Sequence, residues 1–494
     1  MPFRRLLLLS AIILCSLLFI ALIRPVSRDE GQYVAATAFV AAGRLPYRDF
    51  AYLQTPLQPF ALAPIAWLFP GWLFATSRLA NALLGFATVL LVYVASRQLG
   101  AERRAAIAAA ALLPLCFAFL WAVGLARNDM LPAALLAFAM WVWTGPRRGW
   151  AYLSAGIALG LAAGVKISYA VPLATTLAIS LFTPGERRHT LIVAIGSAIG
   201  LAPSIVIAAI DPSAFFFEAI TYPAKAPLLW YTEVGKPSRL GPQRFLYLLN
   251  VAALGPALIA AIEVGRAWRP NGWHCDHRHR ILLAAAAGGL VSAMLNRPFQ
   301  PPYLIPALPP LFVLTAVVCD WPRTRLRQAA WAVFIALGLI APVRWLHKDW
   351  KARQLPLISV ESASREIGTE LRERIGDEPV ATLSPEYLVD SGYRLDPRFA
   401  AGPFLFRTRG MVSERDAREW NVVARDQVGT LPTAPPVAIV IQDPPERVDP
   451  DPDLARQARA LGFVPATRVR NFTIWTRTLK SGEGARCRSQ DQGR

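Results

Sequence analysis

The sequence predicts an α-helical polytopic membrane protein that ends in a small α/β domain. Of the 494 residues, 54% are hydrophobic and only 17% are charged, and the mean hydropathy is +0.36. A soluble chain of this length would form roughly three domains and would carry about 25% charged residues. In addition, the hydrophobic residues gather in runs that are long enough to cross a bilayer. These observations together exclude an ordinary soluble protein.

The apolar runs are confined to residues 1–345. The first, Leu6–Ile23, follows Arg4 and Arg5. Because it has about the length that a bilayer requires and no small-residue cleavage site follows it, we expect a spanning helix and not a signal peptide. Further runs lie at residues 72–96, 105–123, 130–144, 150–165, 168–182, 190–210, 244–264, 281–295, 304–319 and 328–345. The sequence therefore predicts about 11 transmembrane helices.

Arginines in alternate loops predict the orientation of these helices, since positively charged loops normally lie in the cytoplasm. The basic loops contain Arg4, Arg5, Arg97, Arg103, Arg104, Arg147, Arg148, Arg187, Arg188, Arg266, Arg269, Arg278, Arg280, Arg323, Arg325 and Arg327. The N-terminus is therefore expected in the cytoplasm. The other loops, which include residues 24–71, 124–129, 211–243 and 296–303, are expected outside. Most of the formal net charge of +19 thus reflects topology and not nucleic-acid binding.

Residues 346–480 have mixed charge and no spanning run, and they are expected to form an α/β domain on the outer side. Helices are expected at Ser362–Ile375, Ser413–Val428 and Asp453–Leu461, and strands at Pro379–Leu383, Val437–Ile441 and Asn471–Trp475. The segment Asp443–Asp453 is rich in proline and aspartate and is expected to be a loop. Residues 481–494 are expected to be a disordered tail.

The first outer loop carries the most informative polar residues. It contains Arg28-Asp29-Glu30-Gly31-Gln32-Tyr33 and, further on, Gly43-Arg44-Leu45-Pro46-Tyr47-Arg48-Asp49-Phe50 and Gln54-Thr55-Pro56-Leu57-Gln58-Pro59. A carboxylate at the membrane boundary can accept a proton from a hydroxyl group or hold a divalent cation, and arginines can bind an anionic head group. Alternatively, these charges are interfacial boundary residues. Asp29 could also cap a helix that runs to about Ala42 and ends at Gly43.

Further charged residues lie in short outer turns. Arg127 and Asp129 stand in the turn Ala126–Met130, Lys166 is surrounded by apolar residues, and Arg297 stands in the turn Asn296–Tyr303. Such charges are costly against lipid and are reasonable in a shared polar cavity. The alternative is that their side chains extend to the membrane surface, as lysine and arginine often do.

The order of these motifs on one side of the membrane resembles the GT-C superfamily of integral-membrane glycosyltransferases. The resemblance covers roughly residues 1–345. It rests on the first-loop motif, the Arg127-Asn128-Asp129 turn and the Gly160-x-x-x-Gly164-x-Lys166 segment. The most similar branch includes bacterial lipid A aminoarabinose and galacturonic acid transferases, and protein O-mannosyltransferases are more distant.

This resemblance implies a multi-pass protein of the bacterial inner membrane with a periplasmic C-terminal domain. It also implies inverting transfer of a sugar from a polyprenyl-phosphate donor to a lipid, glycan or protein acceptor. Asp29 would be the catalytic carboxylate, Glu30 would assist it, and Asp129 would be a second acid. The cations at the leaving phosphate would be Lys166, Arg127 and Arg297. The surrounding substrate loops would supply Arg28, Tyr33, Tyr47, Arg48, Asp49 and Tyr303. Metal use varies in the superfamily, so a divalent cation stays an open alternative and no cofactor is assigned.

Other functions fit the sequence less well. A transporter or lipid flippase would also place charges among its helices, but no internal repeat is evident and the polar residues concentrate on one side. A scaffold would leave the acidic first loop unexplained. The segment His274-Cys275-Asp276-His277-Arg278-His279 could bind zinc or nickel, but the neighbouring arginines favour a solvated basic loop. The five cysteines lie far apart, which predicts neither disulfides nor structural zinc.

Overall fold

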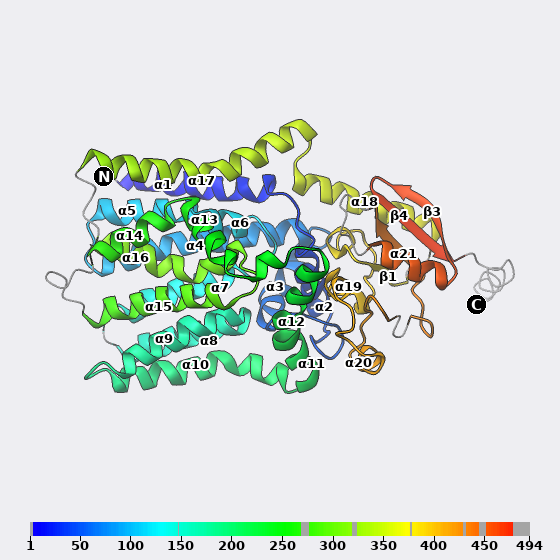
Figure 1. The fold of residues 1–494 in the computed structure, drawn as a ribbon, viewed down its shortest axis with the longest axis horizontal. Coiled ribbons are helices and arrows are strands. Elements are labelled where there is room, and N and C mark those ends of the chain that lie inside the picture. The colour runs from blue at the N-terminus through cyan, green and yellow to red at the C-terminus, as the bar shows by residue number, and fades with distance from the viewer. Residues whose placement is uncertain are drawn as a thin grey trace.

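A bundle of long helices forms one end of the protein and the C-terminal α/β domain forms the other (Figure 1). The computed structural model describes residues 3–146, 148–267, 276–318, 324–375, 378–427, 431–443 and 451–477. The N-terminus lies at the end of the bundle that is remote from the C-terminal domain (Figure 1). The predicted tail 481–494 lies outside the described residues.

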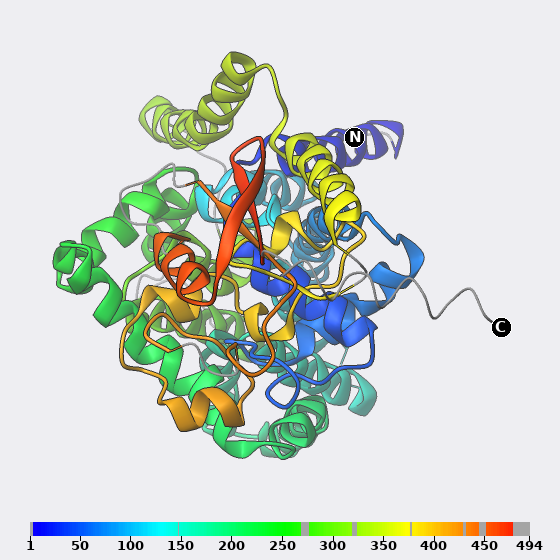
Figure 2. The same cartoon turned by 90° about the vertical axis from the view of Figure 1, so that its right-hand side faces the viewer.

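Every predicted apolar run coincides with a helix or with two successive helices. The bundle contains α1 (Phe3–Ile23), α4 (Leu73–Gln98), α5 (Arg103–Leu112), α6 (Phe117–Val123), α7 (Met130–Trp143), α8 (Gly149–Val165), α9 (Ala170–Leu181), α10 (Arg187–Ala208), α13 (Gln243–Ala253), α14 (Ala257–Ala267), α15 (His277–Leu295), α16 (Leu308–Val318) and α17 (Arg325–Ala352). Figure 2 views the bundle from the side of the C-terminal domain and shows α17 at the periphery. Only 6% of the most apolar 18-residue stretch of α17 is buried inside the protein. This helix therefore turns nearly its whole surface outward, as expected of a helix in lipid.

The predicted number of about 11 spans is not confirmed by the lengths of the helices. Within the described residues, 5 helices are long and apolar enough to cross a membrane, or up to 7 if each bent pair is one span. The pair α5 and α6 is bent by 66° and the pair α13 and α14 by 92°. Pro114 lies at the first break, and Gly255 (φ +121°) and Pro256 lie at the second. Proline removes a helix hydrogen bond and positive φ is not helical, which explains both bends.

Glycines bring α8 and α10 into direct backbone contact. A Cβ atom on Gly156 would lie 2.1 Å from the carbonyl oxygen of Val193, and one on Gly160 would lie 2.2 Å from that of Ser197. Gly196 and Gly200 of α10 lie equally close to the backbone of α8. Small residues of this kind allow close helix packing in membranes, where there is no hydrophobic driving force between helices. This contact fixes α8, and therefore the position of Lys166 at its C-terminal end.

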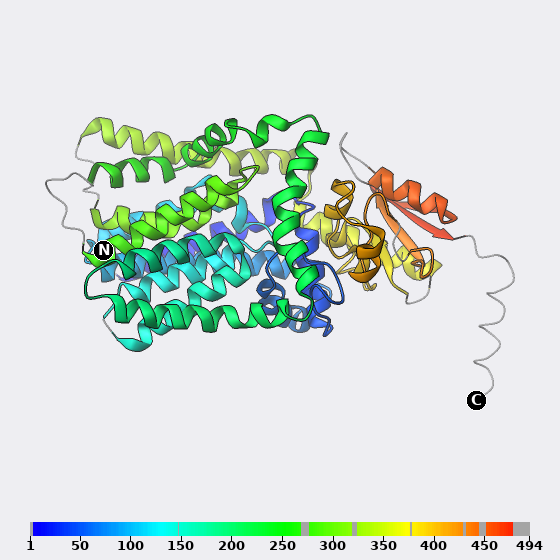
Figure 3. The same ribbon diagram turned by 60° about the horizontal axis from the view of Figure 1, so that its bottom comes forward.

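Short helices lie between the bundle and the C-terminal domain. They are α2 (Glu30–Ala41), α3 (Leu57–Leu68), α11 (Pro212–Phe216) and α12 (Tyr222–Glu233). Figure 3 shows α12, in green, crossing the end of the bundle at a steep angle to the long helices. The predicted helix in the first loop is present, and Gly43 follows it with φ +79°. Asp29 makes no side-chain cap, however, because its carboxylate is engaged in ion pairs.

The C-terminal domain contains a four-stranded sheet with the order β1-β2-β4-β3. β1 (Val380–Thr382) pairs in parallel with β2 (Ala438–Gln442), and β4 (Phe472–Arg477) pairs antiparallel with both β2 and β3 (Phe463–Val469). In the register, Ile439 faces Trp475. Helices α18 (Pro356–Arg374) and α21 (Asp451–Ala460) coincide with predicted helices. The three predicted strands coincide with β1, β2 and β4.

One sequence prediction in this domain is wrong, and one strand is not predicted. The helix expected at Ser413–Val428 is only α20 (Glu414–Glu419), because Asn421 adopts φ +51° and turns the chain. β3 was not predicted, since most of its side chains are exposed or half-exposed and Pro465 interrupts the apolar pattern. The residues 444–450 of the predicted loop are outside the described part of the chain.

Carboxylates of the C-terminal domain cap the first turn of α4. The oxygens of Asp390 accept hydrogen bonds from the backbone N–H groups of Leu73 and Phe74, both at 2.8 Å, and Glu361 accepts from Ala75 at 3.2 Å. These N–H groups have no partner within the helix, and negative charge at a helix N-terminus is stabilising. The domain is thereby fixed to the end of the bundle.

Candidate active site

Five charged side chains meet where the bundle contacts the C-terminal domain. Arg127 donates to Asp29 at 2.8 Å and to Asp129 at 3.3 Å, and Lys166 forms an ion pair with the other oxygen of Asp129. Arg407 donates to the second oxygen of Asp29 at 3.0 Å. We call these residues, Asp29, Arg127, Asp129, Lys166 and Arg407, the charged cluster. The structure thus brings together four predicted site residues and adds a fifth from the C-terminal domain.

Four members of the charged cluster stand where a helix begins or ends, and Arg127 lies in the turn before α7. Asp29 precedes α2 and Asp129 precedes α7, while Lys166 follows α8 in an extended conformation. Arg407 is the last residue of α19 (Phe404–Arg407). Irregular backbone at these ends lets side chains of four separate segments converge, and membrane proteins place such backbone inside protein or along polar cavities.

Amide side chains hold the turn that carries Arg127 and Asp129. The Asn81 amide donates to the carbonyl oxygens of Leu125 at 2.5 Å and of Arg127 at 2.8 Å. Asn128 donates to Gln54 at 3.0 Å and to the carbonyl oxygen of Val165 at 3.2 Å. The turn is therefore tied to α4, to the first loop and to the end of α8. This network fixes the cluster from three sides.

The two arginines keep Asp29 ionised. Burial opposes ionisation of this carboxyl, but Arg407 and Arg127 together outweigh burial and lower the pKa of Asp29 below its ordinary value. Arg127 is also placed over aromatic faces, with its guanidinium carbon 5.7 Å from the ring centre of Tyr33 and 5.0 Å from that of Trp121. Such contacts stabilise a buried cation.

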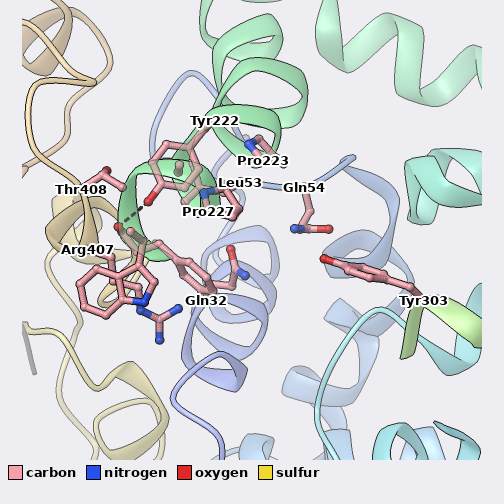
Figure 4. A pocket seen from close by; sticks show the side chains of 12 residues that line it. Gln32, Leu53, Gln54, Tyr222, Pro223, Pro227, Tyr303, Arg407 and Thr408 are labelled. Atoms are coloured by element: carbon pink, nitrogen blue, oxygen red, sulfur yellow. Dashed lines mark hydrogen bonds between the residues drawn. The ribbon is translucent and has the colours of Figure 1, made fainter. Parts of the chain in front are cut away.

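A pocket of about 140 Å³ opens beside the charged cluster (Figure 4). Its lining comes from the first loop, α12, the segment before α16 and the C-terminal domain. The lining residues are Gln32, Leu53, Gln54, Tyr222, Pro223, Ala226, Pro227, Trp230, Tyr303, Phe404, Arg407 and Thr408. Figure 4 shows Tyr222 and Arg407 on one side and Gln54 and Tyr303 on the other. Aromatic rings with a few amides and one cation suit a polar organic ligand.

Buried contacts position the walls of this pocket. The Tyr222 hydroxyl donates to the carbonyl oxygen of Phe404, which joins α12 to the C-terminal domain. Glu218 accepts a hydrogen bond from the backbone N–H of Tyr52 at 2.6 Å and so holds the segment that leads to Gln54. Tyr303 also contacts the cluster, since the Lys166 nitrogen lies 5.2 Å from its ring centre.

Glu30 is paired with a buried arginine and not with Asp29. Its contacts are structural, whereas the sequence predicted that it assists Asp29. Its side chain is fully buried, as is that of Arg78, and the two form a double hydrogen bond at 2.6 and 2.8 Å. The Glu30 oxygens also accept from the backbone N–H groups of Ser27 at 2.9 Å and Ala126 at 2.7 Å. With both oxygens engaged, Glu30 joins the first loop to α4 and to the turn before Arg127.

The predicted loop residues divide between the pocket and supporting positions. Tyr303 lines the pocket and Tyr33 stacks near Arg127. Arg28 donates to Asp451 at 2.5 Å and to Ser384 at 3.2 Å, so it binds the C-terminal domain. Tyr47 is buried, has φ +69° and donates to the carbonyl oxygen of Gln54 at 2.6 Å.

Three further predicted residues do not join the charged cluster. Arg48 and Asp49 form an exposed pair with each other at 2.8 Å. Arg297 is exposed, and within the described part of the chain no ion pair connects it to the cluster. Its predicted role at the leaving phosphate therefore finds no support in the geometry.

Sequence reasoning missed several residues of the site. Arg407 follows an apolar Phe404-Leu405-Phe406 segment and carries no motif that marks it. Gln32 and Gln54 belong to the first-loop segments but have no assigned role, and Tyr222 and Trp230 are not singled out as site residues. The buried Arg78 was hidden within an apolar run.

No cation site is evident in the described residues. Among them, no group of three or more His, Cys, Asp and Glu side chains could hold a metal ion. Asp29 and Asp129 each face two basic side chains, which repel a divalent cation. In the predicted histidine cluster, Asp276 caps α15 and its carboxylate lies 2.5 Å from Nδ1 of His279. His274 and Cys275 lie outside the described residues.

The chain is similar to membrane proteins of known structure. The model of glycosyltransferase family 87 matches residues 52–298, which include Arg127, Asp129 and Lys166 but neither Asp29 nor Arg407. The crystal structure of ArnT from Cupriavidus metallidurans bound to undecaprenyl phosphate matches with a TM-score of 0.63 and 15% identity, over 97% of this chain and 99% of that one. The apo structure of the same protein matches with a TM-score of 0.61 and 15% identity, over 96% and 98%. No curated protein sequence matches.

Proposed function

Because the chain belongs to glycosyltransferase family 87 and is a membrane glycosyltransferase of the GT-C superfamily, we propose that it transfers a sugar from a polyprenyl-phosphate donor with inversion at the anomeric carbon. The resemblance predicted from the first-loop motif is thereby confirmed at the level of the superfamily. The observation that carries the proposal is the placement of Asp29 between two arginines, one of which lines the pocket. The undecaprenyl phosphate in the ArnT crystal structure supports a donor of this class.

The proposed reaction needs a base and a stabilised leaving group. The oxygen of an acceptor hydroxyl attacks the anomeric carbon, and the bond from that carbon to the phosphate oxygen breaks. The electron pair leaves with the polyprenyl phosphate, and the hydroxyl proton passes to Asp29. If the acceptor is an ionised phosphate, Asp29 orients it instead. Fixed cations at the phosphate stabilise the charge that develops as it leaves.

The basic side chains at the end of the bundle remote from the C-terminal domain support a periplasmic site in a bacterial inner membrane. The N-terminus of α4 is capped by Asp390 of the C-terminal domain, and the helix runs the length of the bundle to Arg97. Arg97 lines a pocket with Arg5, Arg103 and Arg104, so this basic group lies at the end of α4 remote from the charged cluster. Positive loops favour the cytoplasm, which would place the cluster, the pocket and the C-terminal domain outside. The acceptor would then be a periplasmic lipid, glycan or protein.

The test of this proposal is Asp29→Asn, which keeps the shape of the side chain and removes its ability to accept a proton. We expect a loss of roughly 100-fold or more in kcat, as is typical when a general base is removed. The protein is reconstituted into liposomes with a panel of polyprenyl-phosphate sugars and an extract of envelope lipids and glycans. Transfer is followed by mass spectrometry, which also identifies sugar and acceptor.

The matched control is Glu414→Gln, at an exposed carboxylate on α20 of the C-terminal domain. This variant should retain full activity. If Asp29→Asn transfers sugar at the rate of the unchanged protein, Asp29 has no part in the chemistry. If the unchanged protein uses no polyprenyl-phosphate sugar, the proposed donor class is wrong.

A further inference from the structure

We propose that Arg407 is an exchangeable cation, which pairs with Asp29 in the arrangement described here and transfers to the phosphate of the lipid-linked donor when that donor binds. The exchange would release one oxygen of Asp29 for the acceptor proton. This inference rests on the proposed function and assigns the C-terminal domain a part in donor recognition. It follows from three features of the charged cluster, which are its net charge, the unequal fixation of its cations and the occupation of both Asp29 oxygens.

The charged cluster carries one uncompensated positive charge. Arg127, Lys166 and Arg407 are its cations, and Asp29 and Asp129 are its carboxylates. Tyr33, Tyr222 and Tyr303 also lie within the electrostatic range of Asp29, and their hydroxyl groups are neutral. A phosphodiester between a sugar and a polyprenyl chain carries one negative charge. Its phosphate would therefore balance the cluster, and arginine is the side chain best suited to bind phosphate through two hydrogen bonds.

The three cations are held to very different degrees. The Arg127 side chain is 10% exposed and the Lys166 side chain 8%, and both pair with Asp129. Arg127 is further fixed through its own carbonyl oxygen, which accepts from Asn81. Arg407 is 24% exposed, lines the pocket, and within the described part of the chain pairs with no carboxylate other than Asp29. Arg407 is thus the cation that can move with the fewest interactions lost.

The paired arrangement blocks the function expected of Asp29. Arg127 engages one carboxylate oxygen and Arg407 engages the other. A carboxylate that is fully paired with two arginines is a weak base, and a general base is most effective when its pKa lies near the working pH. Moving Arg407 to a phosphate frees the second oxygen and makes Asp29 more basic. Donor binding would therefore prepare the base for the acceptor.

The experiment compares Arg407→Gln and Arg407→Lys with the unchanged protein. Arg409→Gln is the matched control, because Arg409 is two residues away, 58% exposed and 3.7 Å from Asp426. Undecaprenyl phosphate serves as the probe, and its dissociation constant is measured with each protein in nanodiscs. We expect Arg407→Gln to weaken binding by about tenfold or more, since a charge-assisted contact is lost. Arg407→Lys should be intermediate and Arg409→Gln unchanged.

The pH dependence of kcat/KM separates exchange from a purely structural role. Without Arg407 the carboxyl of Asp29 loses a neighbouring cation and becomes easier to protonate. The fall of kcat/KM at low pH, which is the acid limb of the profile, should therefore move to higher pH. In addition, the KM for the donor should rise more than the KM for the acceptor. A structural defect would lower the rate at every pH and leave the limb in place. Melting curves of each variant verify that it is folded.

The proposal is overturned if folded Arg407→Gln binds undecaprenyl phosphate as tightly as the unchanged protein and keeps the same acid limb. It is also overturned if only the KM for the acceptor rises, because Arg407 would then recognise the acceptor. The failure of the proposed function has a different signature. In that case the unchanged protein would transfer no sugar, while the binding measurement would still decide whether Arg407 recognises a polyprenyl phosphate.

Discussion

The buried carboxyl group of Glu386 makes stability depend on pH in a way that a single substitution can reveal. Glu386 lies on the 3-10 turn Pro385–Tyr387 of the C-terminal domain, is fully buried, and within the described residues neither of its oxygens has a hydrogen-bond partner. Gly31 of α2 lies against it, since a Cβ there would be 2.5 Å from a Glu386 oxygen. Burial raises the pKa of Glu386 from 4.5 to about 8, and the nearby Arg28 only partly offsets this.

The sign and size of the effect follow from proton linkage. Below pH 4.5 the group is neutral in both the folded and the unfolded chain. Between pH 4.5 and about 8 the unfolded chain releases a proton that the folded chain retains, so the free energy of unfolding falls with rising pH. The fall is about 1.4 kcal/mol per pH unit, or about 3 kcal/mol between pH 5.5 and 7.5. Glu386→Gln keeps the shape, cannot ionise and escapes this loss.

The assay is thermal unfolding of the protein in nanodiscs, followed by tryptophan emission at a series of pH values. The stability of the variant relative to the unchanged protein should increase as pH rises from 5.5 to 7.5. This difference in stability should level off above about pH 8. A control, Glu419→Gln, alters a carboxyl whose side chain is 51% exposed and should show no such trend. A constant difference between Glu386→Gln and the unchanged protein at all pH values would refute the reasoning.

Two more predictions concern the packing that supports the site. Gly156→Val should separate α8 from α10 and lower the melting temperature, because its Cβ would lie 2.1 Å from the carbonyl oxygen of Val193, whereas Gly149→Ala, where nothing lies within 4 Å, should have little effect. Equal melting of the two variants would contradict this. Arg78→Met should cost about 3–5 kcal/mol of stability, because it leaves the buried carboxylate of Glu30 without its cation. Adding Glu30→Gln should recover part of the loss, and a double variant that melts no higher than Arg78→Met would argue against this explanation.

The helices were predictable because the bilayer imposes a strong and local pattern. Each apolar run from Leu6–Ile23 onward coincides with helical structure. What composition does not reveal is whether a run is straight. The break at Gly255 and Pro256 divides one run into α13 and α14, and short helices such as α7 fall below the usual spanning length. The breaks within the runs were therefore less predictable than the positions of the helices.

The site was predictable only where charge stands out against an apolar background. Asp129 and Lys166 are conspicuous for this reason, and the topology placed them on the same side as Asp29. Glu30 was equally conspicuous, yet its partner Arg78 lies inside an apolar helix, so the sequence could not show that Glu30 is already neutralised. Arg407 stands 378 residues from Asp29 in an ordinary mixed segment. No local pattern distinguishes it from the other arginines of the domain.

The charge state of Asp29 is determined jointly by the two halves of the protein. The bundle supplies Arg127, held in place by Asn81 and Asp129, and the C-terminal domain supplies Arg407. At the same interface, Asp390 caps the first turn of α4 and Arg28 forms an ion pair with Asp451. A small displacement of the domain would therefore change a helix cap and an ion pair together with the arginine on Asp29. Since a discrete, multiply bonded contact resists gradual movement, a local exchange of the Arg407 side chain is a less costly way to free Asp29 than movement of the whole domain.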